Sequence, residues 1–149
     1  PTTANGGGNE LDAYLSYDFG PLALTLTNYT FPLDGGVYSD GESFFDGDYT
    51  EISGTTSILG IDLLAGYFTD LEALYIELGF AAGPVDVAIG YADDQGEAWY
   101  AAGGNGIVNM SFSGSREIQI SDSFTLPVFG SFIINPEADT AFLVFGVSF

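Results

Sequence analysis

Four carboxylates recur at one position of an alternating pattern, and they are the side chains most able to do chemistry in this chain. They are Asp12, Asp62, Glu77 and Asp86, and each has an apolar residue on either side. Because neighbouring side chains of a strand point to opposite faces, these carboxylates lie opposite an apolar stripe. Carboxylates gathered inside a pore favour cations. The alternative is a solvated polar interior with no role in transport.

A second set of acids falls in a long stretch with no alternation. Its members are Asp34, Asp40, Glu42, Asp46 and Asp48. Calcium takes six to eight oxygen ligands, so closely spaced carboxylates make this stretch a candidate calcium site. The D-x-D-x-D-G register of a calcium loop is absent, and a flexible acidic loop is the alternative interpretation. No other cofactor is expected.

The charged residues are very unequal in sign. Arg116 is the only lysine or arginine beside 21 acids, which gives a formal net charge of -20. We expect Arg116 to pair with a carboxylate, either across the interior or at its rim, and it joins the interior candidates. Histidine, cysteine and lysine are absent, so no nucleophile has a partner to activate it and enzymatic function is not expected. The acidic charge also excludes nucleic acid as a partner.

The composition suits strands and tight turns. The 149 residues include 21 Gly, 13 Phe and 9 Tyr. The mean hydropathy is +0.25 despite the charge of -20, which indicates that apolar and acidic side chains occupy different surfaces. No apolar run approaches the roughly 20 residues of a transmembrane helix.

Alternation of period two predicts nine strands. A bulge is expected near Gly114 in the long seventh strand. The predicted ranges are Glu10–Phe19, Leu22–Phe31, Asp48–Ser57, Ile61–Phe68, Ala73–Ala81, Val85–Tyr91, Gly106–Ile120, Phe124–Ile134 and Thr140–Phe149.

The last strand is apolar at every second position. Ala141, Leu143, Phe145, Val147 and Phe149 share one face. A strand that closes a transmembrane barrel faces lipid in this way. The ending is similar to the C-terminal insertion signal of bacterial outer-membrane proteins, with Leu143, Phe145, Val147 and Phe149 as its residues.

The connections between the strands alternate in length. Four are tight, at Gly20-Pro21, Leu59-Gly60, Ala82-Gly83-Pro84 and Ser121–Ser123, and two are long, at 32–47 and 93–105. Outer-membrane barrels have short periplasmic turns and longer outer loops. With Phe149 on the periplasmic side, all four tight turns are periplasmic and the first strand starts outside. Because such barrels have an even number of strands, we expect one or three further strands upstream.

Two stretches carry a resemblance to a known family. They are Leu11–Gly20 and Glu117–Phe149, most clearly Ser121–Gly130 followed by Asn135-Pro136 and the terminal strand. They resemble the small porin-like barrels of Bacteroidota-type outer membranes. This resemblance implies an outer-membrane barrel without a catalytic motif, whose members generally have strands upstream of the first one here.

The sequence therefore predicts an all-β fold, a transmembrane antiparallel up-and-down β-barrel formed by residues 1–149 and incomplete at its N-terminal side. The expected function is a porin-like barrel of the Gram-negative outer membrane, either a small cation-favouring pore or a structural subunit of an envelope assembly. Expected partners are membrane lipid, the barrel-insertion machinery and other envelope proteins. The alternative is a soluble, secreted, acidic all-β binding domain.

Overall fold

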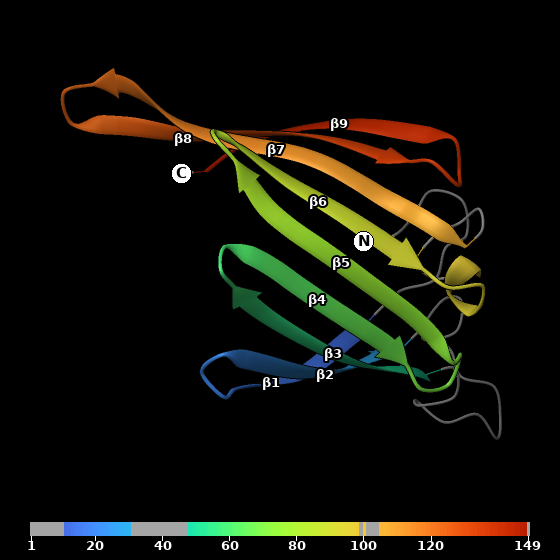
Figure 1. Ribbon diagram of the computed structural model, residues 1–149. Helices are drawn as coiled ribbons and strands as arrows, with labels where there is room; N and C mark the ends of the chain where they lie inside the picture. Colours follow the sequence, from blue (N-terminus) through green and yellow to red (C-terminus); the bar gives the residue numbers. More distant parts are fainter. Residues whose placement is uncertain (1–10, 31–47, 99, 101–104, 149) are drawn as a thin grey trace, which may run out of the picture.

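The computed structural model describes residues 11–30, 48–98, 100 and 105–148 of the chain. They form one antiparallel sheet of nine strands, each paired with the next in sequence order (Figure 1). The short 3₁₀-helix η2 (Gln95–Ala98) follows β6. The strands are β1 (Leu11–Asp18), β2 (Leu22–Thr30), β3 (Asp48–Ile58), β4 (Ile61–Phe68), β5 (Ala73–Ala82), β6 (Val85–Ala92), β7 (Gly106–Ser121), β8 (Phe124–Asn135) and β9 (Thr140–Val147).

The all-β class, the up-and-down order and the nine strands are confirmed, but the expected bulge near Gly114 is wrong. Gly114 pairs regularly with Gly130. The register shifts instead at Val108, opposite the step from Gly90 to Tyr91, and at Ile120 near the end of β7. At each of these two points one residue of β7 has no partner on the neighbouring strand. Between them the side chains of β7 alternate regularly between the two faces.

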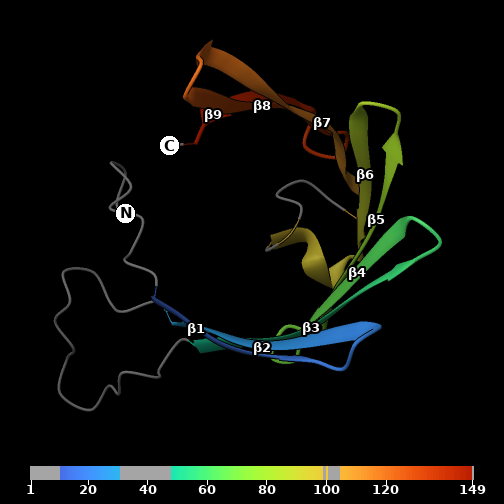
Figure 2. The ribbon, with the colours of Figure 1, turned by 90° about the vertical axis from the view of Figure 1, so that its left-hand side faces the viewer.

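The sheet is strongly curved and open. Figure 2 shows β1–β3, β4–β6 and β7–β9 following one another around an arc, with η2 on its inner side. Strands β1 and β9 are the two edges of the sheet. The side of the arc that holds η2 is called the concave face below, and the opposite side the convex face.

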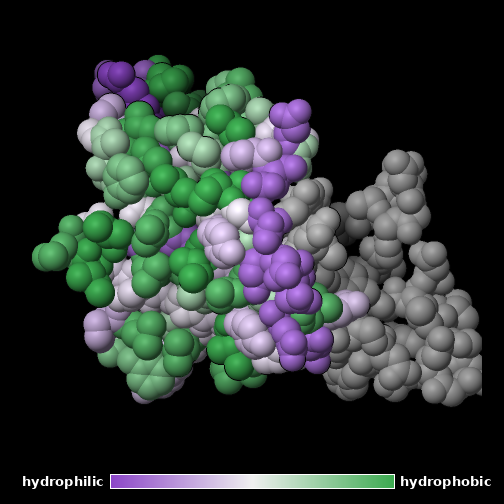
Figure 3. All heavy atoms as spheres, turned by 45° about the vertical axis from the view of Figure 1, so that its right-hand side comes forward, coloured by the Kyte–Doolittle hydropathy of each residue, from purple (hydrophilic) through white to green (hydrophobic). Residues whose placement is uncertain are grey.

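Apolar side chains gather on the convex face. Register places Leu63 beside Leu78, Leu78 beside Ile89, and Ile89 beside Met110, so one apolar row crosses four strands. Among the described residues, 31 large apolar side chains are exposed, whereas only Phe68, Ala73, Ala92 and Val108 are buried hydrophobic residues. Figure 3 shows this apolar surface and a polar band beside the residues drawn in grey. The sheet thus has no second layer over its convex face among these residues.

The two ends of the sheet differ in their connections. At one end the strands are joined by two or three residues, as at Leu59 and Gly60, whose φ angles of 55° and 81° fit a type I′ hairpin turn. At the other end the connections are longer and carry the acids Asp70, Glu72, Asp93, Asp94, Glu137 and Asp139. No helix formed by the described residues is long and apolar enough to span a membrane.

Candidate site on the concave face

A groove of about 690 Å³ lies on the concave face, and four carboxylates line it. They are Asp18, Asp62, Glu77 and Asp86, on four different strands. Small and polar residues such as Ser57, Gly79, Ser111 and Ser113 form part of the wall. Apolar residues such as Leu64, Ala81 and Ala88 form the rest of the wall, so the groove combines four acidic side chains with a mixed polar and apolar surface.

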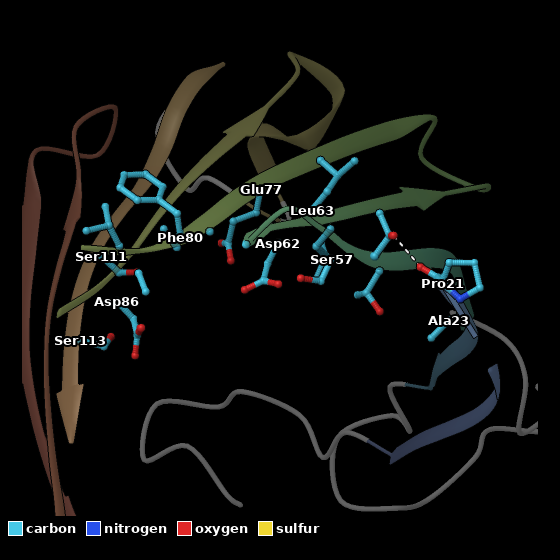
Figure 4. Close-up of a pocket in the computed structure, with 18 of the residues that line it drawn as sticks. Pro21, Ala23, Ser57, Asp62, Leu63, Glu77, Phe80, Asp86, Ser111 and Ser113 are labelled. Atoms are coloured by element: carbon cyan, nitrogen blue, oxygen red, sulfur yellow. Dashed lines mark hydrogen bonds between the residues drawn. The ribbon is translucent and has the colours of Figure 1, made fainter. Parts of the chain in front are cut away.

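Strand register brings these carboxylates to one face. Asp62 pairs with Gly79, two residues beyond Glu77 on β5, and Asp86 pairs with Ala81 on the same strand. Asp62 and Glu77 are therefore diagonal neighbours, which lie roughly 7–8 Å apart, whereas Asp86 lies farther from Glu77 on the same face. In Figure 4 the ends of Asp62, Glu77 and Asp86 point to the same side of the sheet, while Leu63 points away from it. Gly79 lies between these carboxylates on the same face. A Cβ added at Gly79 would lie 3.5 Å from the Asp62 Cβ, which is an ordinary van der Waals contact.

The other two interior candidates lie elsewhere. Asp12 pairs with Tyr29 and shares the face of Asp18, but it is exposed and does not line the groove. Arg116 pairs with Val128 and lies three residues beyond Ser113, which places it on the convex face. The placement of Arg116 differs from the expected interior position, because β7 is regular through this stretch. Asp18 was missed, although it follows the same alternation.

Glu77 is the most firmly held of the groove carboxylates. Its Oε2 accepts hydrogen bonds from the Tyr75 hydroxyl at 2.5 Å and from the Asn109 amide at 2.8 Å. The Tyr75 ring lies over Gly90 of β6 so closely that any Cβ there would collide with it. Gly90 is therefore required for this arrangement, since only glycine leaves room for the phenol.

An aromatic cluster closes part of the concave face at the end that carries η2. The Tyr100 ring stacks on Tyr75 at 5.1 Å and contacts Phe68 at 5.3 Å between ring centroids. Its hydroxyl donates to Glu51 Oε2 at 2.8 Å. Burial, and then the hydrogen bond and charge of Glu51, raise the pKa of Tyr100. Tyr100 belongs to the long connection at 93–105, and its ring packs inward against Tyr75 and Phe68.

The chain folds back at η2 through one aspartate. Asp93 Oδ1 accepts hydrogen bonds from the backbone amides of Gly96, at 2.8 Å, and Leu74, at 3.1 Å. The first bond caps η2 and the second ties it to β5. Tyr100 N then donates to the Gly96 carbonyl at 2.8 Å, which aims its side chain into the arc.

Several predicted residues lie outside the described part of the chain. These are the calcium candidates Asp34, Asp40, Glu42 and Asp46, the side chain of Asp48, and Phe149. Within the ranges that are described, no group of three or more metal-ligating side chains comes together. The other residues of the terminal signal, Leu143, Phe145 and Val147, are exposed on the convex face.

Comparison with protein-family models, with curated proteins and with solved structures finds no match to this chain. The resemblance to porin-like barrels therefore stays a prediction from the sequence.

Proposed function

We propose that the protein is an outer-membrane β-barrel of porin-like type, with lipid against its convex face and an acidic, cation-favouring interior. The observation that carries the proposal is the separation of the two faces. Most of the exposed apolar side chains lie on the convex face, while Asp18, Asp62, Glu77 and Asp86 line the concave one. The exceptions, exposed on the concave face of the outer strands, are Tyr14, Phe129, Phe142 and Val144. Soluble monomers rarely expose contiguous apolar patches larger than a few hundred Å², whereas an apolar row crosses four strands of this convex face. An apolar outer surface is expected where a transmembrane barrel contacts lipid tails.

Closure into a barrel is part of the proposal. Eight antiparallel pairings connect β1 to β9, so these two edge strands run in the same direction. An odd number of further strands, one or three, pairs antiparallel with both edges and gives the even strand count of bacterial outer-membrane barrels. Exposed, unpaired backbone is very costly in lipid, so a membrane-embedded sheet has to close. The insertion machinery would act on the β9 end of the chain.

The aromatic cluster favours a second candidate role. Tyr100, Tyr75 and Phe68 fill space on the concave face, and in barrels of about eight strands side chains fill the interior. A filled interior would make the protein a structural subunit of the envelope, with no conduction.

The first experiment tests membrane insertion. The proposal expects the protein to sediment with the outer membrane, to resist carbonate extraction and to need detergent for solution. Recovery of folded, monodisperse protein in buffer without detergent would refute it and support a secreted acidic binding domain.

The second experiment separates pore from scaffold. The protein is reconstituted in a planar bilayer, and reversal potentials are measured across a salt gradient. The double variant Asp62→Asn, Glu77→Gln removes two groove charges and should lower the cation preference. The matched control Asp122→Asn removes a charge in the β7–β8 turn, away from the groove, and should leave the preference unchanged. Inserted protein without conductance would establish the structural role.

A further inference from the structure

The only lysine or arginine of the chain lies on its apolar face. Arg116 pairs with Val128 on β8 and shares its face with Phe112 and Ile118. It is exposed, and its chain neighbour Glu117 points to the opposite face. The solitary cation of a chain with net charge -20 thus stands among apolar side chains.

A hollow of about 660 Å³ adjoins Arg116 on this surface. Most of its wall is apolar, and it includes Gly114, Ile118, Val128, Gly130, Phe145 and Val147. The two glycines keep it open. A Cβ at Gly114 would meet only the Pro84 carbonyl oxygen, at 3.5 Å, and one at Gly130 would meet the Phe145 ring at 3.5 Å. The hollow can therefore take a flexible hydrocarbon chain.

The height of Arg116 along the strands is also informative. Val128, its partner, pairs on its other side with Val147, the last residue of β9. Pro84, which belongs to the tight β5–β6 turn, lines the same hollow. Arg116 is thus level with the end of the sheet where the short turns lie. In a barrel with lipid on its convex face, this level is the boundary between acyl chains and headgroups.

We infer that Arg116 and the hollow bind one phospholipid of the leaflet on the short-turn side, an inference that rests on the proposed function. The guanidinium donates hydrogen bonds to the phosphate oxygens, for which its planar fork is well suited. One acyl chain lies over Gly114 and Gly130. Charge complementarity selects this occupant, because the rest of the acidic chain repels anionic headgroups and Arg116 alone attracts them.

The test uses protein purified in detergent, with bound lipid counted by native mass spectrometry during titration. Phosphatidylglycerol carries phosphate and chains, diacylglycerol carries chains alone, and glycerol phosphate carries the head alone. Arg116→Gln should lower phosphatidylglycerol affinity about tenfold or more and leave diacylglycerol binding unchanged. Gly114→Leu, which fills the hollow but keeps the cation, should weaken phosphatidylglycerol several-fold. Ala65→Leu, on the convex face of β4, is the matched control and should bind like the wild type.

Heat-modified migration in electrophoresis establishes that each variant is folded before its affinity is compared. Equal phosphatidylglycerol binding by folded wild type and Arg116→Gln would overturn the inference while leaving the barrel proposal intact. Binding of glycerol phosphate as strong as that of the whole lipid would also overturn it, because the hollow would then contribute nothing. Wild-type protein that is folded and soluble without detergent would instead refute the barrel itself.

Discussion

Two adjacent leucines of β4, Leu63 and Leu64, point to opposite faces of the sheet. An arginine introduced at each in turn tests whether the convex face contacts lipid. Leu63 points away from the groove carboxylates (Figure 4) and is 37% exposed, whereas Leu64 lies on the concave face beside its partner Glu77. Leu63 is the third residue of β4 and pairs with Leu78, four residues before the end of β5, so it lies within the proposed apolar belt. Arginine at a lipid-facing position near the bilayer midplane costs about 2–4 kcal/mol. Leu63→Arg should therefore lower the folding equilibrium constant about 30-fold to about 1,000-fold, at ~1.4 kcal/mol per factor of ten.

Leu64→Arg is the matched control on the neighbouring position. Leu64 pairs with Glu77, and a cation there gains an opposite charge worth about 0.2–1 kcal/mol across the strands. We expect the free energy of unfolding to change by less than about 1 kcal/mol for this variant. The assay is reversible urea unfolding in phosphatidylcholine vesicles, followed by the fluorescence of the single tryptophan. A Leu63→Arg cost no larger than that of Leu64→Arg would mean that the convex face contacts water, and the membrane proposal would fail.

Two further substitutions test the concave face in the same unfolding assay. Gly90→Ala should lower the free energy of unfolding by about 1–3 kcal/mol, because its Cβ collides with the Tyr75 ring; Gly79→Ala, with only ordinary contacts, should change it little, and equal losses would contradict the packing described. Tyr100→Phe should cost about 1–3 kcal/mol, since it leaves the Glu51 carboxylate without this donor. Because the pKa of Tyr100 is raised on folding, its phenol stays neutral while the unfolded chain ionises above about pH 10. Stability should fall with rising pH there, and Tyr100→Phe should flatten that slope; an unchanged slope would contradict the burial of Tyr100.

Alternation alone was enough to predict the strands and most of their faces. Each strand has one face that is largely apolar, so a shift of one residue would reverse every side chain. This constraint explains why β4 was predicted with the bounds that the structure has, and why Asp62, Glu77 and Asp86 were assigned to one face. Strand ends were less well defined, as at β3, which extends one residue beyond the predicted range to Ile58.

The position of Arg116 could not be predicted because it depends on where the bulges lie. A face change near Gly114 would turn Arg116 inward, whereas regular pairing from Met110 to Gln119 keeps it on the convex face. Bulges are decided by the pairing of two strands, and alternation within one strand carries only part of that information.

The alternation of apolar and polar residues also could not predict contacts between residues far apart in the sequence. Tyr100 bonds to Glu51, which lies 49 residues earlier in the chain. One signal was present in the sequence, because Gly66 and Gly90 occupy concave positions where an aromatic ring from a neighbouring segment can lie. Glycines on the concave side of a strand therefore indicate positions over which a tyrosine from a neighbouring segment can pack.

The lengths of the connections and the position of the cation select the same end of the sheet. Two- and three-residue connections lie at the end where β7 continues past Arg116 to Ser121, and the acidic connections lie at the other. Short turns are periplasmic in bacterial outer-membrane barrels, so in the proposed barrel the first feature favours a periplasmic position for that end. The second does so by the side to which the charge points, because Arg116 faces the convex side, where phospholipid headgroups attract it, whereas Asp18 and Asp86 near the same end line the concave groove. The two features are physically independent, and both favour the same orientation of the proposed barrel.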